Sequence, residues 1–508
     1  MNILLDKWIP VITKKASMEQ LSLEQLLCNE GDWEIVHHRD DMELAALEIC
    51  ISLVQSIFKV NSEEQLKLCL RQPLNNKDYQ KAVKEYVRWF DLKELQFPFL
   101  QTRGLNSKDV VPIQKLFNGL PEGNNHTWHY NAASRISQIC ASCAVIALFN
   151  QATSTPSFGG GFKNPLRGAA PITTLLKGRT LRETIWLNVL SQGFISRHYP
   201  TNTVNIPNWV VKVEKGQDVE AAKFGLLRGL FWQPALIELV WQQPQTQPQI
   251  EVQQKQIICD SCGVETKESI IGFKRQKFDY KLVSDFLHPH SPRVSVNKKG
   301  EQITFYNSFN DSRPSWTQLA AFVFEQKQKD TQTLPALVIE QYREIFPNQQ
   351  LNLIVGGYIN NQAKIIERRH ESFSLTEKLN SEEIQHALLL GVEIGNLVRG
   401  KAYGLGLSAN LDKLSGGSLG NIVSDLQGVY YSKSESIVHS LIARINSFED
   451  KEQAIDEFIS KLTRIGDELL VDFASGYQTM NNHLNASRKT LNAAITKLSK
   501  SKKETVNV

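Results

Sequence analysis

Residues 381–399 read SEEIQHALLLGVEIGNLVR, and their apolar side chains recur every three or four positions, as on one face of a helix. The same periodicity returns at residues 434–448, 451–473 and 477–500, and most of these segments are joined by short polar links. Consecutive amphipathic helices with short connections pack as antiparallel neighbours. The sequence therefore predicts an antiparallel four-helix bundle, which we place at residues 372–508.

The chain before this bundle contains both strand-like and helical patterns. Residues 257–310 alternate short apolar and polar pieces, with a turn at Asn297–Gly300, which is typical of β-structure. Helical periodicity predicts helices at residues 42–60, 62–70, 77–90, 315–328 and 334–345. We therefore expect a large mixed α/β domain over residues 1–371, and an α+β fold class for the whole chain.

Composition sets limits on the class of protein. The 508 residues are 41% hydrophobic, which is enough for a real core and argues against disorder. With 57 Lys and Arg against 53 Asp and Glu, the net charge of +4 is too small to indicate nucleic-acid binding, so any basic surface must be local. The sequence has no signal peptide and no long apolar run, so we expect a cytoplasmic protein without a membrane segment.

Two cysteine pairs carry the strongest local signal. Cys140-Ala-Ser-Cys143 and Cys259-Asp-Ser-Cys262 have the spacing with which two knuckles close a tetrahedral zinc site. Four sulfur ligands leave no position for water, so such a zinc would be structural. A redox pair, or two unrelated CxxC sequences, remain the alternatives. The other three cysteines fit core thiols: Cys28, Cys50 and Cys69.

A glycine-rich loop follows the first knuckle. Ser157-Phe158-Gly159-Gly160-Gly161 leaves the backbone without side chains, and Lys163 comes two residues later. It fits neither a Walker A loop nor a dinucleotide-binding fingerprint. Two interpretations remain open at this point, a tight structural turn or a backbone surface that lies against nucleic acid.

A polar hairpin tip and two basic clusters are further candidates. Gly356-Gly357-Tyr358 precedes Asn361-Gln362-Ala363, and amide side chains at such a tip can reach base edges in a groove. An ordinary exposed turn explains the same residues. Basic residues gather at Lys274–Lys277 and at Lys298–Lys299, where they would suit phosphate contacts.

The sequence offers little evidence of a catalytic site. The chain has no GxSxG, HExxH or Walker pair. His288, His290 and His370 could serve a metal-dependent nuclease, which we keep as the alternative function. Glu367 and His370 are separated by two arginines, which favours a surface ion-pair cluster over acid–base chemistry. The sequence favours a protein that is not an enzyme.

Many segments in the same order resemble the CasA family, the large subunits of the type I-E CRISPR surveillance complex Cascade. The resemblance runs through nearly the whole chain. The matching segments are LLDKWIPV (4–11), RDDMELAA (39–46), FPFLQT (97–102), ALFNQ (147–151), FGGGFK (158–163), RGLFWQPA (228–235), PHSP (289–292), PSWTQ (314–318), GGY (356–358), NNQA (360–363) and ERRH (367–370).

The resemblance implies a non-catalytic subunit that reads the protospacer-adjacent motif, the PAM, from the minor groove and promotes strand separation and R-loop formation. It implies a glycine loop at Ser157–Gly161, a lysine finger at Lys277, and a wedge at Gln362 flanked by Asn361 and Ala363. Lys298 and Lys299 fall where family members contact the displaced strand. The implied partners are the other Cascade subunits that carry the crRNA, the crRNA 5′ handle, double-stranded target DNA, and a helicase–nuclease effector used in antiviral defence.

The sequence departs from the family pattern in three places. Ser157 stands where glycine is expected, and it adds a hydroxyl to the loop. Residues 124–130, which would grip the guide handle, diverge, so Trp128 and His129 are the candidates there. Residues 242–256 form a Gln- and Pro-rich stretch that we expect to be an exposed loop or hairpin tip.

Overall fold

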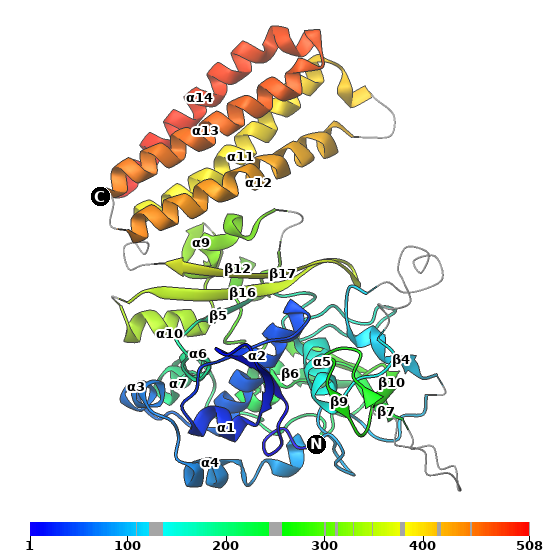
Figure 1. Ribbon diagram of the computed structural model, residues 1–508. Coiled ribbons are helices and arrows are strands. Elements are labelled where there is room, and N and C mark those ends of the chain that lie inside the picture. Colours follow the sequence, from blue (N-terminus) through cyan, green and yellow to red (C-terminus); the bar gives the residue numbers. More distant parts are fainter. Residues whose placement is uncertain are drawn as a thin grey trace. The chain divides into compact units, whose positions relative to one another are not determined.

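The structure is a computed structural model of the chain (Figure 1). It describes residues 1–107, 109–120, 136–242, 257–298, 301–309, 313–328, 330–347, 349–375, 382–413, 418–447 and 450–506. The chain forms two compact units. The first comprises Met1–Ser308, Ala336–Ile345 and Leu353–Ser372, and the second comprises Phe309–Pro335, Phe346–Asn352 and Phe373–Val508.

The grouping of two internal segments could not be seen in the sequence. Residues 309–335 and 346–352 belong to the unit that holds the C-terminal helices, although both precede residue 372 in the chain. The domain boundary drawn at residues 371 and 372 stays a prediction.

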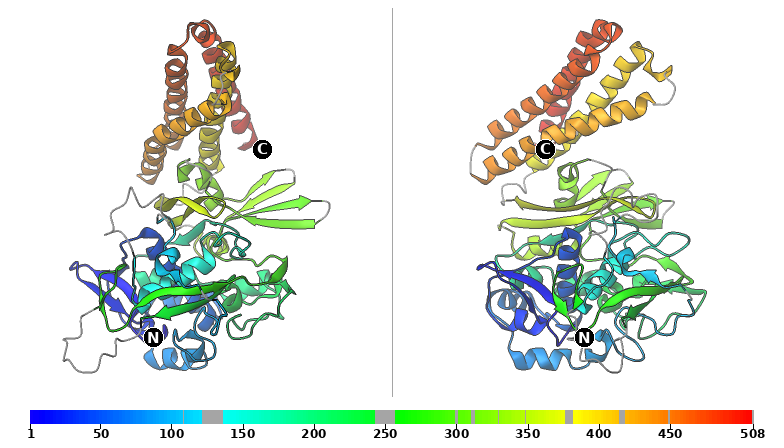
Figure 2. Two further views of the ribbon diagram at one scale, coloured as in Figure 1. Left: turned by 90° about the vertical axis from the view of Figure 1, so that its right-hand side faces the viewer. Right: turned by 45° about the vertical axis from the view of Figure 1, so that its right-hand side comes forward.

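The second unit contains the helical bundle. Its helices are α11 (Glu382–Ser408), α12 (Leu419–Asn446), α13 (Lys451–Ser475) and α14 (Gln478–Val506). Helix α11 packs against each of the other three, and the helices run alongside one another in every view (Figures 1 and 2). Each helix reverses the direction of the one before it (Figure 1). The bundle predicted from apolar periodicity is confirmed.

Helix α12 begins well before the predicted residue 434. Ser418 caps its N-terminus, since its side chain accepts a hydrogen bond from the backbone N–H of Asn421 at 3.3 Å. Gly420 and Gly428 weaken the local helix signal in this stretch, which is why periodicity alone placed the start too late. Packing of Leu419, Val423 and Tyr430 in the bundle core outweighs that cost.

The helix predicted at 315–328 is wrong in its second half. The chain forms a 3₁₀ turn, η6 (Ser315–Gln318), and a short helix, α9 (Leu319–Val323), and then turns into strand β14 (Gln326–Gln328). Strand β14 pairs antiparallel with β15 (Thr331–Leu334). Residues 325–330 carry no apolar side chain that could extend the buried face of α9, so the helix ends there.

The first unit has several small sheets and a helical layer. Its helices are α1 (Leu23–Cys28), α2 (Asp40–Ile57), α3 (Glu63–Arg71), α4 (Asn76–Val83), α5 (Ala141–Thr153), α6 (Leu181–Leu187), α7 (Gln192–His198), α8 (Leu226–Leu230) and α10 (Leu337–Ile345), with 3₁₀ turns η1 (Val87–Phe90), η2 (Ile113–Leu116) and η5 (Ala221–Lys223). Helices α2 and α5 pack against each other and are buried almost all round. Predicted helices at 42–60, 62–70 and 334–345 are confirmed, whereas only the first part of 77–90 is α-helical.

The strands of the first unit form three-stranded sheets and further antiparallel or parallel pairings. One sheet has the strand order β2 (Met18–Leu21), β1 (Ile9–Thr13) and β3 (Trp33–Ile35). A second has the order β4 (Val111–Pro112), β10 (Ile270–Gln276) and β7 (Leu236–Trp241). A third has the order β17 (Lys364–Leu375), β16 (Leu351–Asn361) and β5 (Thr173–Leu176). Further pairings join β11 (Tyr280–Ser284) to β6 (Gln217–Glu220), β8 (Ile257–Ile258) to β9 (Glu265–Thr266), and β12 (Arg293–Lys298) to β13 (Glu301–Tyr306). The predicted β-structure of residues 257–310 is confirmed.

A buried ion pair ties the glycine-loop segment to the core of the first unit. Arg167 and Glu48 are each about as buried as a core leucine, and their side chains lie 3.2 Å apart. The Arg167 guanidinium also donates to the hydroxyls of Thr173 and Ser291, both at 2.9 Å. A buried charge is tolerated only when it is paired and hydrogen-bonded in this way. The chain after the glycine loop is therefore anchored.

Two buried histidines make the first unit sensitive to acid. Burial lowers the pKa of His290 to about 3, although its Nε2 lies 3.0 Å from the carbonyl oxygen of Asn188. Burial also lowers the pKa of His288 well below its ordinary value. Between about pH 6.5 and pH 3, the unfolded chain binds a proton at His290 that the folded chain excludes.

We therefore expect the free energy of unfolding to fall as the pH is lowered from 6.5. His290 alone contributes up to about 1.4 kcal/mol per pH unit, or about 1.6 kcal/mol between pH 6.5 and pH 5. Urea titrations at those two pH values measure the change. In His290→Gln, whose amide can still donate to the Asn188 carbonyl, the slope should be shallower; an identical slope would contradict the assignment.

In the described part of the chain, no helix is both long and apolar enough to cross a bilayer.

Candidate functional site

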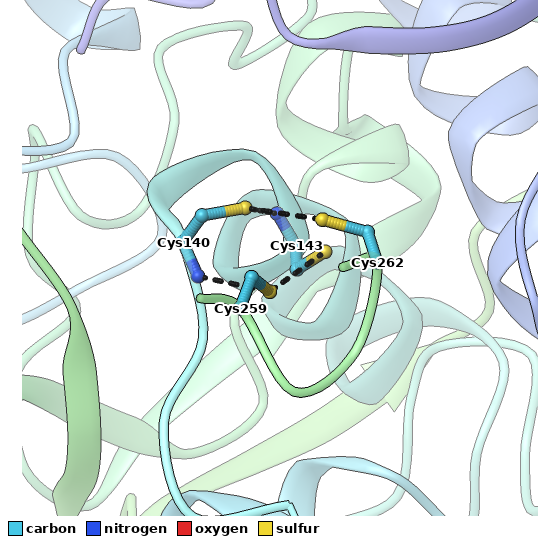
Figure 3. A group of neighbouring side chains, drawn as sticks. All are labelled: Cys140, Cys143, Cys259 and Cys262. Carbon is cyan, nitrogen blue, oxygen red and sulfur yellow. Dashed lines mark hydrogen bonds between the residues drawn. The ribbon is translucent and has the colours of Figure 1, made fainter. Parts of the chain in front are cut away.

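The four predicted metal ligands come together from two elements of the first unit. Cys140 is the N-cap of α5, and Cys143 lies in its first turn. Cys259 and Cys262 lie in the turn that follows β8, which Gly263 closes with a φ of +73°. Figure 3 shows the four sulfurs directed toward one another. The two CxxC pairs are therefore one site and not unrelated sequences.

The geometry of this four-cysteine cluster fits a tetrahedral metal. The four sulfurs all lie within 4.8 Å of one another, and the Cys140–Cys262 and Cys143–Cys259 sulfur pairs are each 3.8 Å apart. A tetrahedron with Zn–S bonds of about 2.3 Å has edges of about 3.8 Å. Cys140, Cys143 and Cys259 are buried, and Cys262 is partly exposed. Within the described ranges this is the only group of three or more potential metal-ligating side chains.

Backbone and thiol donors favour a thiolate at Cys259, whereas hydrogen bonds with the neighbouring thiols raise the pKa of Cys143 and Cys262. The backbone N–H of Cys140 donates to the sulfur of Cys259 at 3.2 Å, and that of Cys143 donates to the sulfur of Cys140 at 3.5 Å. Hydrogen bonds from the Cys140, Cys143 and Cys262 thiols, with the backbone N–H of Cys140, lower the pKa of Cys259. The N-terminus of α5 adds a positive potential. Thiolates are the form that binds a metal.

His37 also contacts the cluster, a contact that the sequence did not reveal. Its Nδ1 accepts the backbone N–H of Arg39 at 3.1 Å, so a neutral ring carries its proton on Nε2. Nε2 lies 3.3 Å from the Ser261 hydroxyl and 3.8 Å from the sulfur of Cys143. Burial, the largest cause, lowers the pKa of His37 to about 4, which keeps the ring neutral. No spacing rule links residue 37 to residues 143 and 261.

The glycine loop follows α5 and turns sharply. Gly159, Gly160 and Gly161 have φ values of +73°, +56° and +88°, a left-handed run that residues with a Cβ rarely adopt. The loop is closed by the backbone N–H of Phe162, which donates to the carbonyl oxygen of Gly159 at 3.1 Å. The Ser157 hydroxyl accepts the N–H of Gly159 at 3.4 Å, so the departure at residue 157 supports the turn.

Three predicted segments, far apart in the sequence, meet at this loop. A Cβ built on Gly159 would lie 3.4 Å from the Cβ of Ala363, at the tip of the β16–β17 hairpin. A Cβ built on Gly161 would lie 3.3 Å from the Nζ of Lys277, just beyond β10. A Cβ built on Gly160 would have no neighbouring atom within 4 Å, so the backbone is open at this residue. We call the group formed by Gly159–Gly161, Lys277 and Gln362–Ala363 the loop–hairpin site.

The hairpin tip places Gln362 in a strained conformation. Residues Gln362 and Ala363 form the turn between β16 and β17, and both are exposed. Gln362 has a φ of +54°, where a residue with a Cβ costs about 1–2 kcal/mol. The Asn360 side chain donates to the Gln362 carbonyl oxygen at 2.7 Å and fixes this turn. A positive φ at the first central residue is what a two-residue hairpin turn of this kind requires, so the turn accounts for this conformation.

The lysine that follows the glycines is exposed and lies near the site. The Nζ of Lys163 is 5.8 Å from the ring centroid of Tyr280, on β11. Arg167, in contrast, points into the core and adds no charge to the open surface. Asn361 is exposed next to Gln362.

Most of the remaining predicted contact residues lie outside the described residues. Lys298 is the last residue of β12, and Lys299 lies outside the described residues. Trp128 and His129 also lie outside them, as does the Gln-rich stretch from residue 243 to residue 256. Their roles stay predictions.

The three histidines of the alternative nuclease hypothesis do not make a metal site in the described structure. His288 and His290 are buried, and their ring centroids are 5.4 Å apart. His370 lies instead beside a surface ion pair: its Nδ1 is 3.9 Å from Glu43, and Arg368 pairs with Asp40 at 2.9 Å. This arrangement confirms the interpretation of the Glu367–His370 segment.

Comparison with known proteins defines the class. The chain has the fold of Cse1 and CasA proteins of known structure. It is similar to Cse1 from Thermobifida fusca, with a TM-score of 0.71 and 15% identity over 98% of both chains. It is similar to CasA from Thermus thermophilus, with a TM-score of 0.69 and 16% identity over 98% of this chain and 99% of the other.

The family follows from the sequence itself. The family model of CRISPR-associated protein Cse1 matches residues 2–469, and the chain belongs to this family. A similar structure from Thermus thermophilus is that of CasA (Cse1), so the resemblance to CasA is confirmed. A chain of a CRISPR RNA-guided surveillance complex also matches, with a TM-score of 0.59 and 14% identity over 97% of this chain and 99% of that one.

Proposed function

We propose that this chain is the non-catalytic large subunit of a type I-E Cascade complex, and that it reads the PAM in double-stranded DNA from the minor groove. Membership of the Cse1 family supports this proposal. In it, the chain binds a complex that carries crRNA, contacts the 5′ handle of the guide, and helps to recruit the helicase–nuclease effector. The work takes place in the cytoplasm and serves antiviral defence.

The observation that carries the proposal is the convergence of the loop–hairpin site. Gly159 lies against Ala363, and Lys277 lies against Gly161, although these residues come from three separate parts of the chain. A glycine backbone can approach base pairs that any side chain would hold away. The minor groove offers a degenerate donor and acceptor pattern, so recognition there tolerates several PAM sequences.

Each part of the site has a distinct task. The Lys277 ammonium supplies a positive charge beside the open backbone of Gly160, where it can meet a phosphate or a base edge. The Gln362 amide, projecting from a fixed turn, wedges below the PAM and offsets part of the cost of unstacking, about a few kcal/mol per base step. Pairing with the guide then supplies the sequence specificity that the protein lacks.

We further propose that the four-cysteine cluster holds a structural zinc ion. The 3.8 Å sulfur separations, the burial and the complete set of four thiols support this. The cluster joins the start of α5, which leads into the glycine loop, to the β8–β9 turn, which leads into β10 and Lys277. Its role is to fix the positions of these two segments relative to each other.

A lysine substitution tests the contact with DNA. In the assembled complex, Lys277→Ala should weaken PAM-containing DNA binding and reduce the slope of log affinity against log salt by about one, because one phosphate contact is lost. Titrations of labelled duplex at several salt concentrations measure both quantities. Lys81→Ala, on the distant helix α4, is the matched control. An unchanged slope in Lys277→Ala would argue against this contact.

A further inference from the structure

One side chain contacts both aromatic residues that flank the glycines. The guanidinium carbon of Arg275 is 4.9 Å from the ring centroid of Phe158 and 5.1 Å from that of Phe162. These are the residues immediately before Gly159 and immediately after Gly161. The two rings also meet edge to face, with centroids 5.5 Å apart and an interplanar angle of 80°. Arg275 and the two rings therefore close the base of the loop.

The same strand supports the loop at two further points. Phe273, on β10, is fully buried, and its ring centroid is 5.7 Å from that of Phe158. Residues two apart along a strand share a face, so Phe273 and Arg275 project toward the loop together. The chain continues from β10 directly to Lys277, whose Nζ approaches Gly161. Strand β10 thus carries Phe273 and Arg275, which support the loop, and leads directly to Lys277.

The loop needs such a support. Three consecutive glycines lose more conformational freedom on ordering than any other residues would, so their own backbone favours disorder. Hydrogen bonds of Ser157, Asn164 and Phe162 shape the turn, but they do not reach the strand beneath it. A guanidinium is broad and weakly hydrated, so it can keep cation–π contacts with two rings at once, whereas a lysine ammonium is a compact and strongly hydrated point charge.

We propose that Arg275 is a positioning residue that holds Gly159–Gly161 in the conformation that reads the PAM, and so sets how strongly the complex discriminates PAM from non-PAM duplexes. This inference rests on the proposed function. Arg275 acts through Phe158 and Phe162, and its own contact with DNA is not required.

The test compares Arg275→Lys with the wild type in the fully assembled complex. The lysine keeps the charge, but its compact and strongly hydrated ammonium loses the cation–π contact with both rings, so the ratio of PAM to non-PAM affinity should fall about tenfold, while the salt slope stays the same. A role in binding phosphate predicts that both quantities stay the same, because a lysine keeps the phosphate contact, so retained discrimination would contradict the proposal. Lys281→Ala, an exposed residue on β11, is the control and should change neither quantity.

Amide hydrogen exchange gives a second measurement on the same complexes without DNA. The Gly159–Gly161 amides should exchange faster in Arg275→Lys, at an unchanged melting temperature. Phe162→Leu removes one of the two rings and should give the same faster exchange and the same loss of PAM discrimination. This second variant keeps the test decisive if Arg275→Lys fails to assemble. Unchanged exchange and unchanged discrimination in these variants would overturn the proposal. If the wild-type complex shows no PAM dependence, the proposed function fails, and the exchange rates alone still decide whether Arg275 positions the loop.

Discussion

Cys259→Ser should destabilise the first unit strongly and abolish metal binding. The purified wild-type chain should contain about one zinc ion per molecule, since four sulfurs fill a tetrahedral shell. Structural zinc contributes about 10 kcal/mol or more in zinc-finger peptides, which have almost no core. Because this unit has a large core of its own, we expect a loss of about 5 kcal/mol and a fall in melting temperature of about 10 °C. Metal analysis and thermal unfolding measure the two effects.

A second thiol serves as the control for this prediction. Cys28 lies at the end of α1, half-buried and away from the cluster, so Cys28→Ser should keep both the metal and most of the stability. A chelator should reproduce the effect of Cys259→Ser on the wild-type chain, whereas a reductant without chelating groups should have none. Destabilisation by the reductant alone would indicate a redox pair and contradict the zinc site.

Gln362→Gly should separate folding from DNA opening. Glycine adopts a φ of +54° without penalty, so the substitution relieves about 1 kcal/mol of strain in the β16–β17 turn. The hairpin should therefore keep or gain stability. The same change removes the amide that wedges below the PAM, so R-loop formation on duplex DNA should fall at least about tenfold. Gel-shift and footprinting assays on the assembled complex report the loss.

A substrate opened in advance gives the decisive comparison for this residue. When the first base pairs next to the PAM are mismatched, the cost of unstacking is already met, and Gln362→Gly should bind about as well as the wild type. Lys277→Ala should not be rescued, because its contact does not depend on opening. Gln362→Asn, which tolerates the left-handed turn but is one methylene shorter, tests how far the amide must reach. Normal R-loop formation on closed duplex by Gln362→Gly would exclude the wedge.

The helical bundle, the four-cysteine cluster and the hairpin tip could be predicted from sequence because each leaves a local pattern. Apolar periodicity fixed the bundle helices, except where Gly420 and Gly428 interrupt α12. The spacing of two residues between cysteines identified the four cysteines that come together. The polar Asn361-Gln362 pair marked the turn between β16 and β17.

The convergence of the loop–hairpin site has no such local pattern. Gly161, Lys277 and Ala363 are brought together by tertiary packing, and residue types alone suggested only a resemblance to family members. Arg275 stood within a basic cluster in which the resemblance to the family singled out only Lys277. Its neighbours Phe158 and Phe162 distinguish it in the structure. His37 likewise gains its position at the cysteines from the packing of β3 and α2, which no spacing encodes.

PAM-library binding by the reconstituted complex, with and without this chain, tests the central claim most directly. The proposal predicts that enrichment of particular PAM sequences disappears when the chain is omitted and weakens in Gln362→Gly, while the guide still pairs with single-stranded target. Equal enrichment with and without the chain would contradict the proposal and leave this subunit, at most, a scaffold for its partners.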